Sequence, residues 1–87
     1  MKELKDTIAL MTSPDYKERF RAEYWQTKIR YEKLRKILTD KKAGTLPFTL
    51  SCPVTLLEMQ LETMRLYLNT LKMRALVEGV DLEVSHE

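Results

Sequence analysis

Polar side chains recur at every seventh position of the stretch LLEMQLETMRLYLNTLKMR, at Gln60, Tyr67 and Arg74. An amide, a phenol and a guanidinium suit binding, because they donate hydrogen bonds, stack on flat rings and grip phosphate oxygens. The line runs between two apolar stripes, so its members become partly buried once both stripes are covered, and unpartnered buried groups cost about 1–3 kcal/mol each. Two interpretations stay open: the three residues pair with their own copies and fix the register of an oligomer, or they line a pocket between subunits.

Basic residues flank an earlier helical stretch beside Tyr24 and Tyr31. Cations next to tyrosine rings suit a ligand that carries phosphates and a base or sugar face. Lysines and arginines beside a hydrophobic seam also simply keep their charged ends in water, and this alternative stays open. Lys17, Arg21, Lys28 and Arg35 follow a spacing of 4, 7 and 7. The predicted ligand-binding residues are Arg74, Tyr67, Gln60, Arg21, Tyr24, Lys28, Tyr31 and Arg35.

No constellation of residues predicts an enzyme. The sequence has no Ser-His-acid set, no glycine-rich phosphate loop and no HExxH motif. Cys52 lacks a plausible base, because the single histidine, His86, lies near the end of the chain. We therefore expect no catalytic residue, no metal site and no cofactor.

The helices that position these residues can be predicted from the few residues that interrupt helices, two glycines and three prolines. Ser13-Pro14-Asp15 predicts a helix over about 14–40, with Ser13 as N-cap and Pro14 in the first helical position. Cys52-Pro53 opens a second helix over about 53–78 in the same way, and Gly79 closes it.

The remaining segments are short. Residues 1–12 form an amphipathic segment with Leu4, Ile8 and Met11 on one face, and residues 80–87 are expected to form a loosely held tail. Residues 41–52 connect the helices, and the apolar side chains there are expected to cover one end of the hairpin. The predicted fold is all-α: residues 13–79 form a long antiparallel two-helix hairpin that follows a short N-terminal helix.

Each long helix carries two apolar faces. The facing seams are Phe20, Tyr24, Thr27, Tyr31, Leu34 and Leu38 in the first helix and Leu57, Leu61, Met64, Leu68, Leu71 and Ala75 in the second. The second helix also carries Leu56, Met59, Thr63, Leu66, Thr70, Met73 and Val77 at the same kind of spacing. One hairpin partner covers only one face, so we expect a helical homo-oligomer. Its predicted interface residues are Trp25, Ile29, Leu56, Met59, Leu66, Met73 and Val77. The alternative is a monomeric bundle in which the N-terminal helix covers the second face.

Charge and hydropathy narrow the class of protein. The 87 residues carry fifteen basic and thirteen acidic side chains, a net charge of +2, with the basic excess concentrated between Tyr16 and Lys42. Four acidic residues interspersed there argue against nucleic-acid binding. Charges interrupt every apolar run well short of the roughly 18 residues that a membrane span needs, and no secretory signal opens the chain. A lone cysteine suits a reducing compartment. We expect a soluble intracellular protein with no membrane partner.

The pattern of KERFRAEYWQTKIRYEKLRKIL followed by LLEMQLETMRLYLNTLKMRALVEGVDL resembles the small helical-hairpin proteins of tailed phages and prophages that are named after a crAss-like phage protein. The matching positions of the second helix are Gln60, Met64, Tyr67, Leu68, Leu71 and Arg74. The resemblance implies a phage protein acting in the bacterial cytoplasm. By analogy with the phage sponges Sequestin and Lockin, it implies sequestration of a cyclic ADP-ribose-type or cyclic oligonucleotide signal of Thoeris or CBASS immunity.

A competing hypothesis makes the chain a structural or interaction protein whose second apolar seam binds a host or phage protein.

Overall fold

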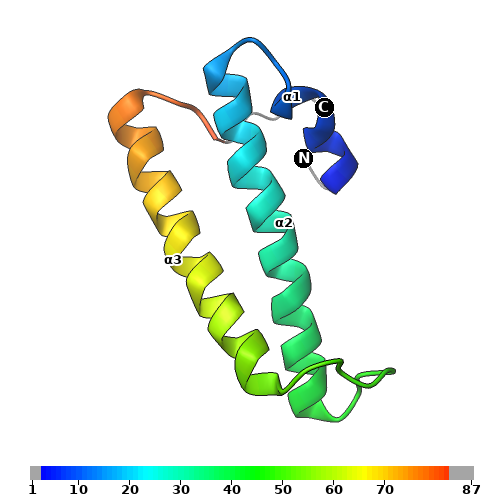
Figure 1. Ribbon diagram of the computed structural model, residues 1–87. Helices are drawn as coiled ribbons and strands as arrows, with labels where there is room; N and C mark the ends of the chain where they lie inside the picture. Colours follow the sequence, from blue (N-terminus) through cyan, green and yellow to red (C-terminus); the bar gives the residue numbers. More distant parts are fainter. Residues whose placement is uncertain (1–2, 83–87) are drawn as a thin grey trace.

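The computed structural model describes residues 3–82, and all regular structure in that range is helical (Figure 1). A 3₁₀ turn, Leu4–Thr7, leads into the single-turn helix α1, Ile8–Met11. Helix α2, Tyr16–Ala43, and helix α3, Val54–Glu78, run antiparallel as a hairpin. The prediction of an all-α chain is confirmed for the described residues, whereas the predicted homo-oligomer stays a prediction.

Helix α2 begins and ends on local capping interactions. Asp15 is the N-cap, and its carboxylate accepts a hydrogen bond of 2.9 Å from the backbone N–H of Lys17. The prediction of Ser13 as N-cap is therefore wrong, because the Ser13 hydroxyl instead donates to the Glu18 carboxylate at 2.5 Å and accepts from the Asp15 N–H at 3.0 Å. Gly44 ends the helix in the left-handed region, with φ of 78°.

Helix α3 begins one residue later than expected and ends as expected. Pro53 is itself the N-cap rather than the first helical residue, so Cys52 does not cap the helix. At the other end Gly79 has φ of 72°, and the Val80 N–H donates to the Ala75 carbonyl at 2.9 Å. This backbone bond to the carbonyl five residues back is typical of the Schellman motif, for which glycine is favoured at position 79 because it has no Cβ.

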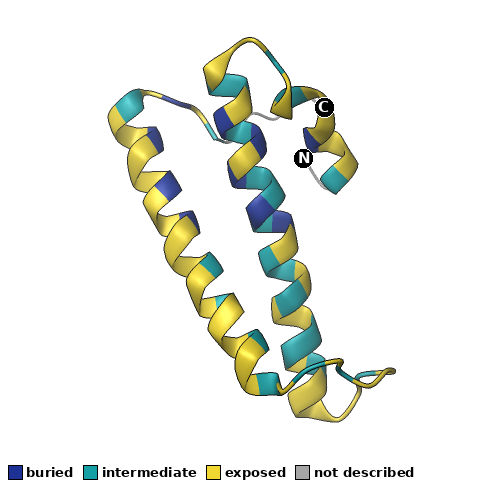
Figure 2. Cartoon of the chain, viewed as in Figure 1, coloured by how far each residue is buried: buried dark blue, intermediate teal, exposed yellow. Residues whose placement is uncertain are grey.

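The hairpin core lies where α2 begins and α3 ends (Figure 2). Its buried residues are Phe20, Tyr24, Leu68, Leu71, Ala75 and Val80. Leu71 is 1% exposed and Tyr24 is 3% exposed. Toward the connecting loop the same two seams are only partly buried, and in the loop itself Phe48 is 54% exposed. The seams predicted to face each other therefore do so, with tight burial at one end.

The second apolar face of α3 is open. Leu56, Met59, Leu66, Met73 and Val77 are between 52% and 88% exposed. The N-terminal segment packs against α2 and makes no contact with α3 (Figure 1). The alternative in which this segment covers the second face of α3 is therefore wrong for the chain as described.

The chain beyond Gly79 is anchored to α2. Val80 is 6% exposed, the Trp25 indole N–H donates to the Leu82 carbonyl at 2.8 Å, and the Arg21 Nε donates to the Asp81 carbonyl at 2.7 Å. The expected loose tail is thus wrong for residues 80–82, while residues 83–87, including His86, lie outside the described range.

Two kinds of feature are absent from residues 3–82, a membrane-spanning helix and a cluster of metal-binding side chains. None of the helices there is both long and apolar enough to cross a bilayer. No group of three or more potential metal-binding side chains comes together in residues 3–82.

Candidate ligand-binding site

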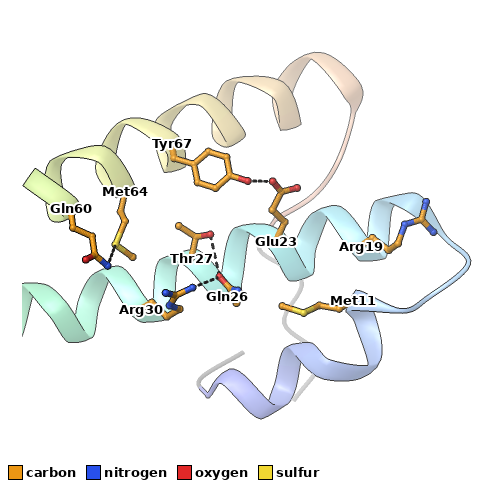
Figure 3. Close-up of a pocket in the computed structure, with 9 residues that line it drawn as sticks. All are labelled: Met11, Arg19, Glu23, Gln26, Thr27, Arg30, Gln60, Met64 and Tyr67. Carbon is orange, nitrogen blue, oxygen red and sulfur yellow. Dashed lines mark hydrogen bonds between the residues drawn. The ribbon is translucent and has the colours of Figure 1, made fainter.

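Two grooves between α2 and α3 contain predicted ligand-binding residues. The larger groove, of about 540 Å³, is bounded at one side by Met11 of α1 (Figure 3). Helix α3 contributes Gln60, Met64 and Tyr67 to it. Two of these, Gln60 and Tyr67, belong to the predicted polar line. The groove has the size of a small-molecule site, for which about 300–1,000 Å³ is usual.

Helix α2 supplies the opposite wall of the larger groove. Its lining residues are Arg19, Glu23, Gln26, Thr27 and Arg30. They follow from helix geometry, because steps of three and four residues keep side chains on one side of an α-helix. The wall therefore combines two guanidinium groups, one amide and one carboxylate along the flank of the core seam.

A hydrogen bond joins the two walls: the Tyr67 hydroxyl donates to the Glu23 carboxylate (Figure 3). Along α2 the Arg30 guanidinium donates only a long bond of 3.5 Å to the Gln26 side-chain oxygen, and the Arg19 guanidinium donates to the Ser13 carbonyl at 2.6 Å. Within residues 3–82 neither arginine forms a salt bridge. Arg30 thus keeps most of its five donors for a ligand.

The smaller groove, of about 200 Å³, lies between the same two helices and is more basic. It collects three predicted residues, Lys28, Tyr31 and Arg35, and adds Arg65 and Lys72 from α3. The basic side chains on α2 share one partner, because the Glu32 carboxylate lies 3.3 Å from Lys28 Nζ and 2.7 Å from Arg35 Nη2.

Arg65 in the smaller groove is also engaged. Its guanidinium contacts the Glu62 carboxylate through two nitrogens, at 2.9 and 2.5 Å. This hydrogen bonding lowers the pKa of Glu62 and raises that of Arg65. The larger groove is therefore the roomier of the two, and its arginines are the less neutralised.

Arg74 lies in neither groove. Its guanidinium donates to the Glu78 carboxylate at 2.7 and 3.2 Å and lies 4.7 Å from the centre of the Phe20 ring. The Tyr16 hydroxyl donates to the same carboxylate at 2.7 Å. Hydrogen bonds from Arg74 and then from Tyr16 lower the pKa of Glu78, and the bond to Glu78 raises the pKa of Tyr16.

Two more predicted ligand-binding residues, Arg21 and Tyr24, make contacts that stabilise the fold and lie in neither groove. Arg21 holds the Asp81 carbonyl, and Tyr24 is buried in the core with its ring edge-to-face on Trp25, the centroids 5.3 Å apart. The eight predicted residues are thus divided among two grooves, the open end of the hairpin, the start of the tail and the core. The structure does not bring them together into one site.

The predicted interface residues also separate into two groups. Ile29 is 8% exposed and Trp25 is partly buried against the core, so both are covered within the single chain. The other five form the open face of α3 described above. Their role in self-association stays a prediction.

Sequence reasoning missed the α2 wall of the larger groove. Arg19, Glu23, Gln26 and Arg30 are separated by 4, 3 and 4 positions. That spacing was a usable signal, since it places polar residues in one line along the flank of the seam.

Comparisons with known proteins give one positive result. The model of the family described as Sequestin matches residues 14–76, which include α2 and nearly all of α3. No curated protein and no solved structure matches the chain. The match includes every residue of α2 and α3 that lines either groove.

Proposed function

Because the chain belongs to the Sequestin family, we propose that it is a non-enzymatic binding protein that sequesters a small nucleotide signal. The family match over residues 14–76 is the observation that carries this proposal. A sponge of this kind acts by lowering the free concentration of a signal, so it requires affinity and no catalytic group. The protein is then a phage-encoded inhibitor of nucleotide-based bacterial immunity of the Thoeris or CBASS type, and it acts in the host cytoplasm.

The larger groove is the proposed binding site. Arg30 forks onto phosphate oxygens, with Arg19 available at the far end of the groove, because guanidinium groups bind phosphate through two parallel hydrogen bonds. The Tyr67 ring stacks on a base, and Gln26 and Gln60 hydrogen-bond to base edges or sugar hydroxyls.

The class of ligand follows from the same chemistry. Cyclic ADP-ribose-type molecules and cyclic oligonucleotides carry two or more phosphates and at least one flat base. A groove of about 540 Å³ with guanidinium, phenol and amide groups complements those features. The Glu23 carboxylate lies at the middle of the α2 wall, where it would repel a phosphate and can accept a hydrogen bond from a sugar hydroxyl.

Titration of the purified protein with cyclic ADP-ribose and with cyclic dinucleotides tests the assignment. Arg30→Ala removes charge-assisted hydrogen bonds worth about 1.5–3 kcal/mol, so we expect affinity to fall roughly 10- to 100-fold. Arg65→Ala is the matched control, because it removes an arginine from the smaller groove instead. Loss of binding in Arg65→Ala together with normal binding in Arg30→Ala would reject the larger groove as the site.

One observation supports a second function, that of an interaction protein. The open face of α3 has the spacing by which amphipathic helices pack against other helices. A protein that is monomeric, retains no nucleotide and binds none would favour this alternative over sequestration.

A further inference from the structure

The open face of α3 is a continuous heptad seam. Leu56, Met59, Thr63, Leu66, Thr70, Met73 and Val77 follow steps of 3 and 4 over six turns of the helix. All seven are exposed, and none is charged. This is the spacing at which one helix packs against another through alternating a and d positions.

The two threonines in the seam do not need polar partners from another molecule. The Thr63 hydroxyl donates to the Met59 carbonyl at 2.9 Å, and the Thr70 hydroxyl donates to the Leu66 carbonyl at 3.0 Å. With the hydroxyls directed along their own helix, burial of these residues leaves no unsatisfied donor.

We propose that a second copy of α3 covers this seam, packed antiparallel to the first around a two-fold axis near Leu66. From Met59 to Val77 the seam alternates the longer Met59, Leu66 and Met73 with the smaller β-branched residues Thr63, Thr70 and Val77. In an antiparallel pair each a position faces a d position, so each layer joins a smaller side chain with a longer one and the layers have similar volume. Antiparallel helix dipoles also attract.

The charges at the edges of the seam are compatible with self-pairing. Between residues 55 and 77 the flanking positions hold one cation, Arg74, and one anion, Glu62, on opposite edges of the helix. In an antiparallel pair, each edge of the seam meets the same edge of the second copy. Because the two-fold axis lies near Leu66, Arg74 lies near Gln60 of the second copy, and Glu62 lies near Leu76 of the second copy. No like charges meet at either edge.

The available area matches a modest but specific dimer. A helix of 25 residues is about 38 Å long and about 10 Å wide, so a strip along it covers roughly 400 Å² of each copy before flanking side chains are counted. With the flanks of both copies included, the contact approaches the roughly 1,000 Å² that separates specific interfaces from incidental ones.

The arrangement has a consequence for the larger groove, and this part of the inference rests on the proposed function. Gln60 and Tyr67 line that groove and also border the open seam. Because the two-fold axis is perpendicular to both helices, the polar lines of the two copies lie together on one face. Both larger grooves then open on the same side of the dimer, and Arg74 of one copy lies toward the groove of the other.

Sedimentation velocity of the ligand-free protein tests the dimer. Wild type is expected to sediment as a dimer, and Leu66→Glu, which places a charge at the centre of the seam, is expected to sediment as a monomer with unchanged helical circular dichroism. Phe48→Glu is the matched control: Phe48 is 54% exposed and Leu66 is 53% exposed, but Phe48 lies in the loop. A monomeric wild type, or a dimer that survives Leu66→Glu, overturns the proposal.

Cross-linking tests the orientation. In a Cys52→Ser background, single cysteines replace Met59, Leu66 or Met73, and a short bis-maleimide is added. In the antiparallel pair the Leu66→Cys positions lie within about 6 Å along the axis, whereas the Met59→Cys or Met73→Cys positions lie about 15 Å or more apart. We expect only Leu66→Cys to cross-link. Efficient cross-linking of all three variants indicates a parallel pair and overturns the antiparallel arrangement.

These outcomes are separable from those of the nucleotide titration. Both assays of the seam use protein without ligand, and Arg30 lies on α2, outside the seam. A dimer that binds no nucleotide rejects the proposed function and keeps the interface. A monomer that binds nucleotide through Arg30 does the reverse.

Discussion

Tyr67 on α3 and Glu23 on α2 are joined by a hydrogen bond across the larger groove, the phenol donating to the carboxylate. The bond joins the two helices that form the proposed site, and Tyr67 itself is 40% exposed and lines the groove. The hydroxyl and the ring therefore have separable roles, the first in positioning and the second in stacking.

Substitution at Tyr67 separates these roles. Tyr67→Phe keeps the ring, so we expect nucleotide affinity to change less than about threefold and unfolding free energy to fall by about 1 kcal/mol or less. Tyr67→Ala removes a stacking surface worth about 1–3 kcal/mol and should weaken binding roughly 5- to 100-fold. Calorimetric titration of both variants measures the difference. Equal losses in the two variants would show that the hydroxyl, not the ring, contacts the ligand.

The anchored segment after Gly79 leads to a prediction about the single tryptophan. Ending the chain at Gly79 removes buried Val80 and the acceptor of the Trp25 indole, which together contribute about 2–4 kcal/mol. We expect lower stability to urea and greater quenching of Trp25 fluorescence by acrylamide. A chain ending at Leu82 retains these contacts and is the matched control. Unchanged quenching in the shorter chain would contradict the anchoring role.

The position of the core predicts unequal costs for two leucines on α3. Leu71 is 1% exposed and packs in the hairpin core, so Leu71→Ala should cost about 2–5 kcal/mol of unfolding free energy. Leu76 is 85% exposed, and Leu76→Ala should cost under about 1 kcal/mol. Urea unfolding followed by circular dichroism, at a fixed protein concentration, compares them. Similar costs at both positions would mean that the core has been misplaced.

Glu78 predicts a pH dependence of stability. Its pKa in the folded chain is lowered by the hydrogen bonds from Arg74 and Tyr16, so its contribution is present above the pKa of the unfolded chain and is lost as pH falls through the folded pKa. Between about pH 6 and about pH 3, where carboxylates titrate, wild type should lose more stability than Glu78→Gln. Glu58→Gln, at an exposed position on the same helix, should behave as wild type. Parallel pH profiles for wild type and Glu78→Gln would contradict the assignment.

The hairpin was predictable because its signals are local and periodic. Leu68, Leu71 and Ala75 occur at helical spacing and are buried as expected, and Gly79 ends the helix in the conformation that glycine favours. The N-cap of α2 was missed by two residues, because Ser13 and Asp15 are both good capping residues and the proline directly after Ser13 favoured the earlier one.

The site was less predictable because its assembly depends on placements that spacing does not specify. Tyr24 has the same residue type and periodicity as a ligand-stacking tyrosine, yet the position of α3 buries it. Arg74 pairs with Glu78, four residues further along the helix, and lies outside both grooves, so its predicted role in binding stays a prediction. Arg30 was overlooked because its groove exists only once α1 and α3 pack on either side of that flank of α2.

Native mass spectrometry of the protein purified from cells with active nucleotide-based immunity tests the central claim most directly, because it reports subunit number and retained small molecules together. The account predicts a dimer that carries a phosphorylated nucleotide in wild type, and loss of that nucleotide in Arg30→Ala. A wild-type protein that carries no nucleotide, and that acquires none when cyclic ADP-ribose or cyclic dinucleotides are added, would contradict it.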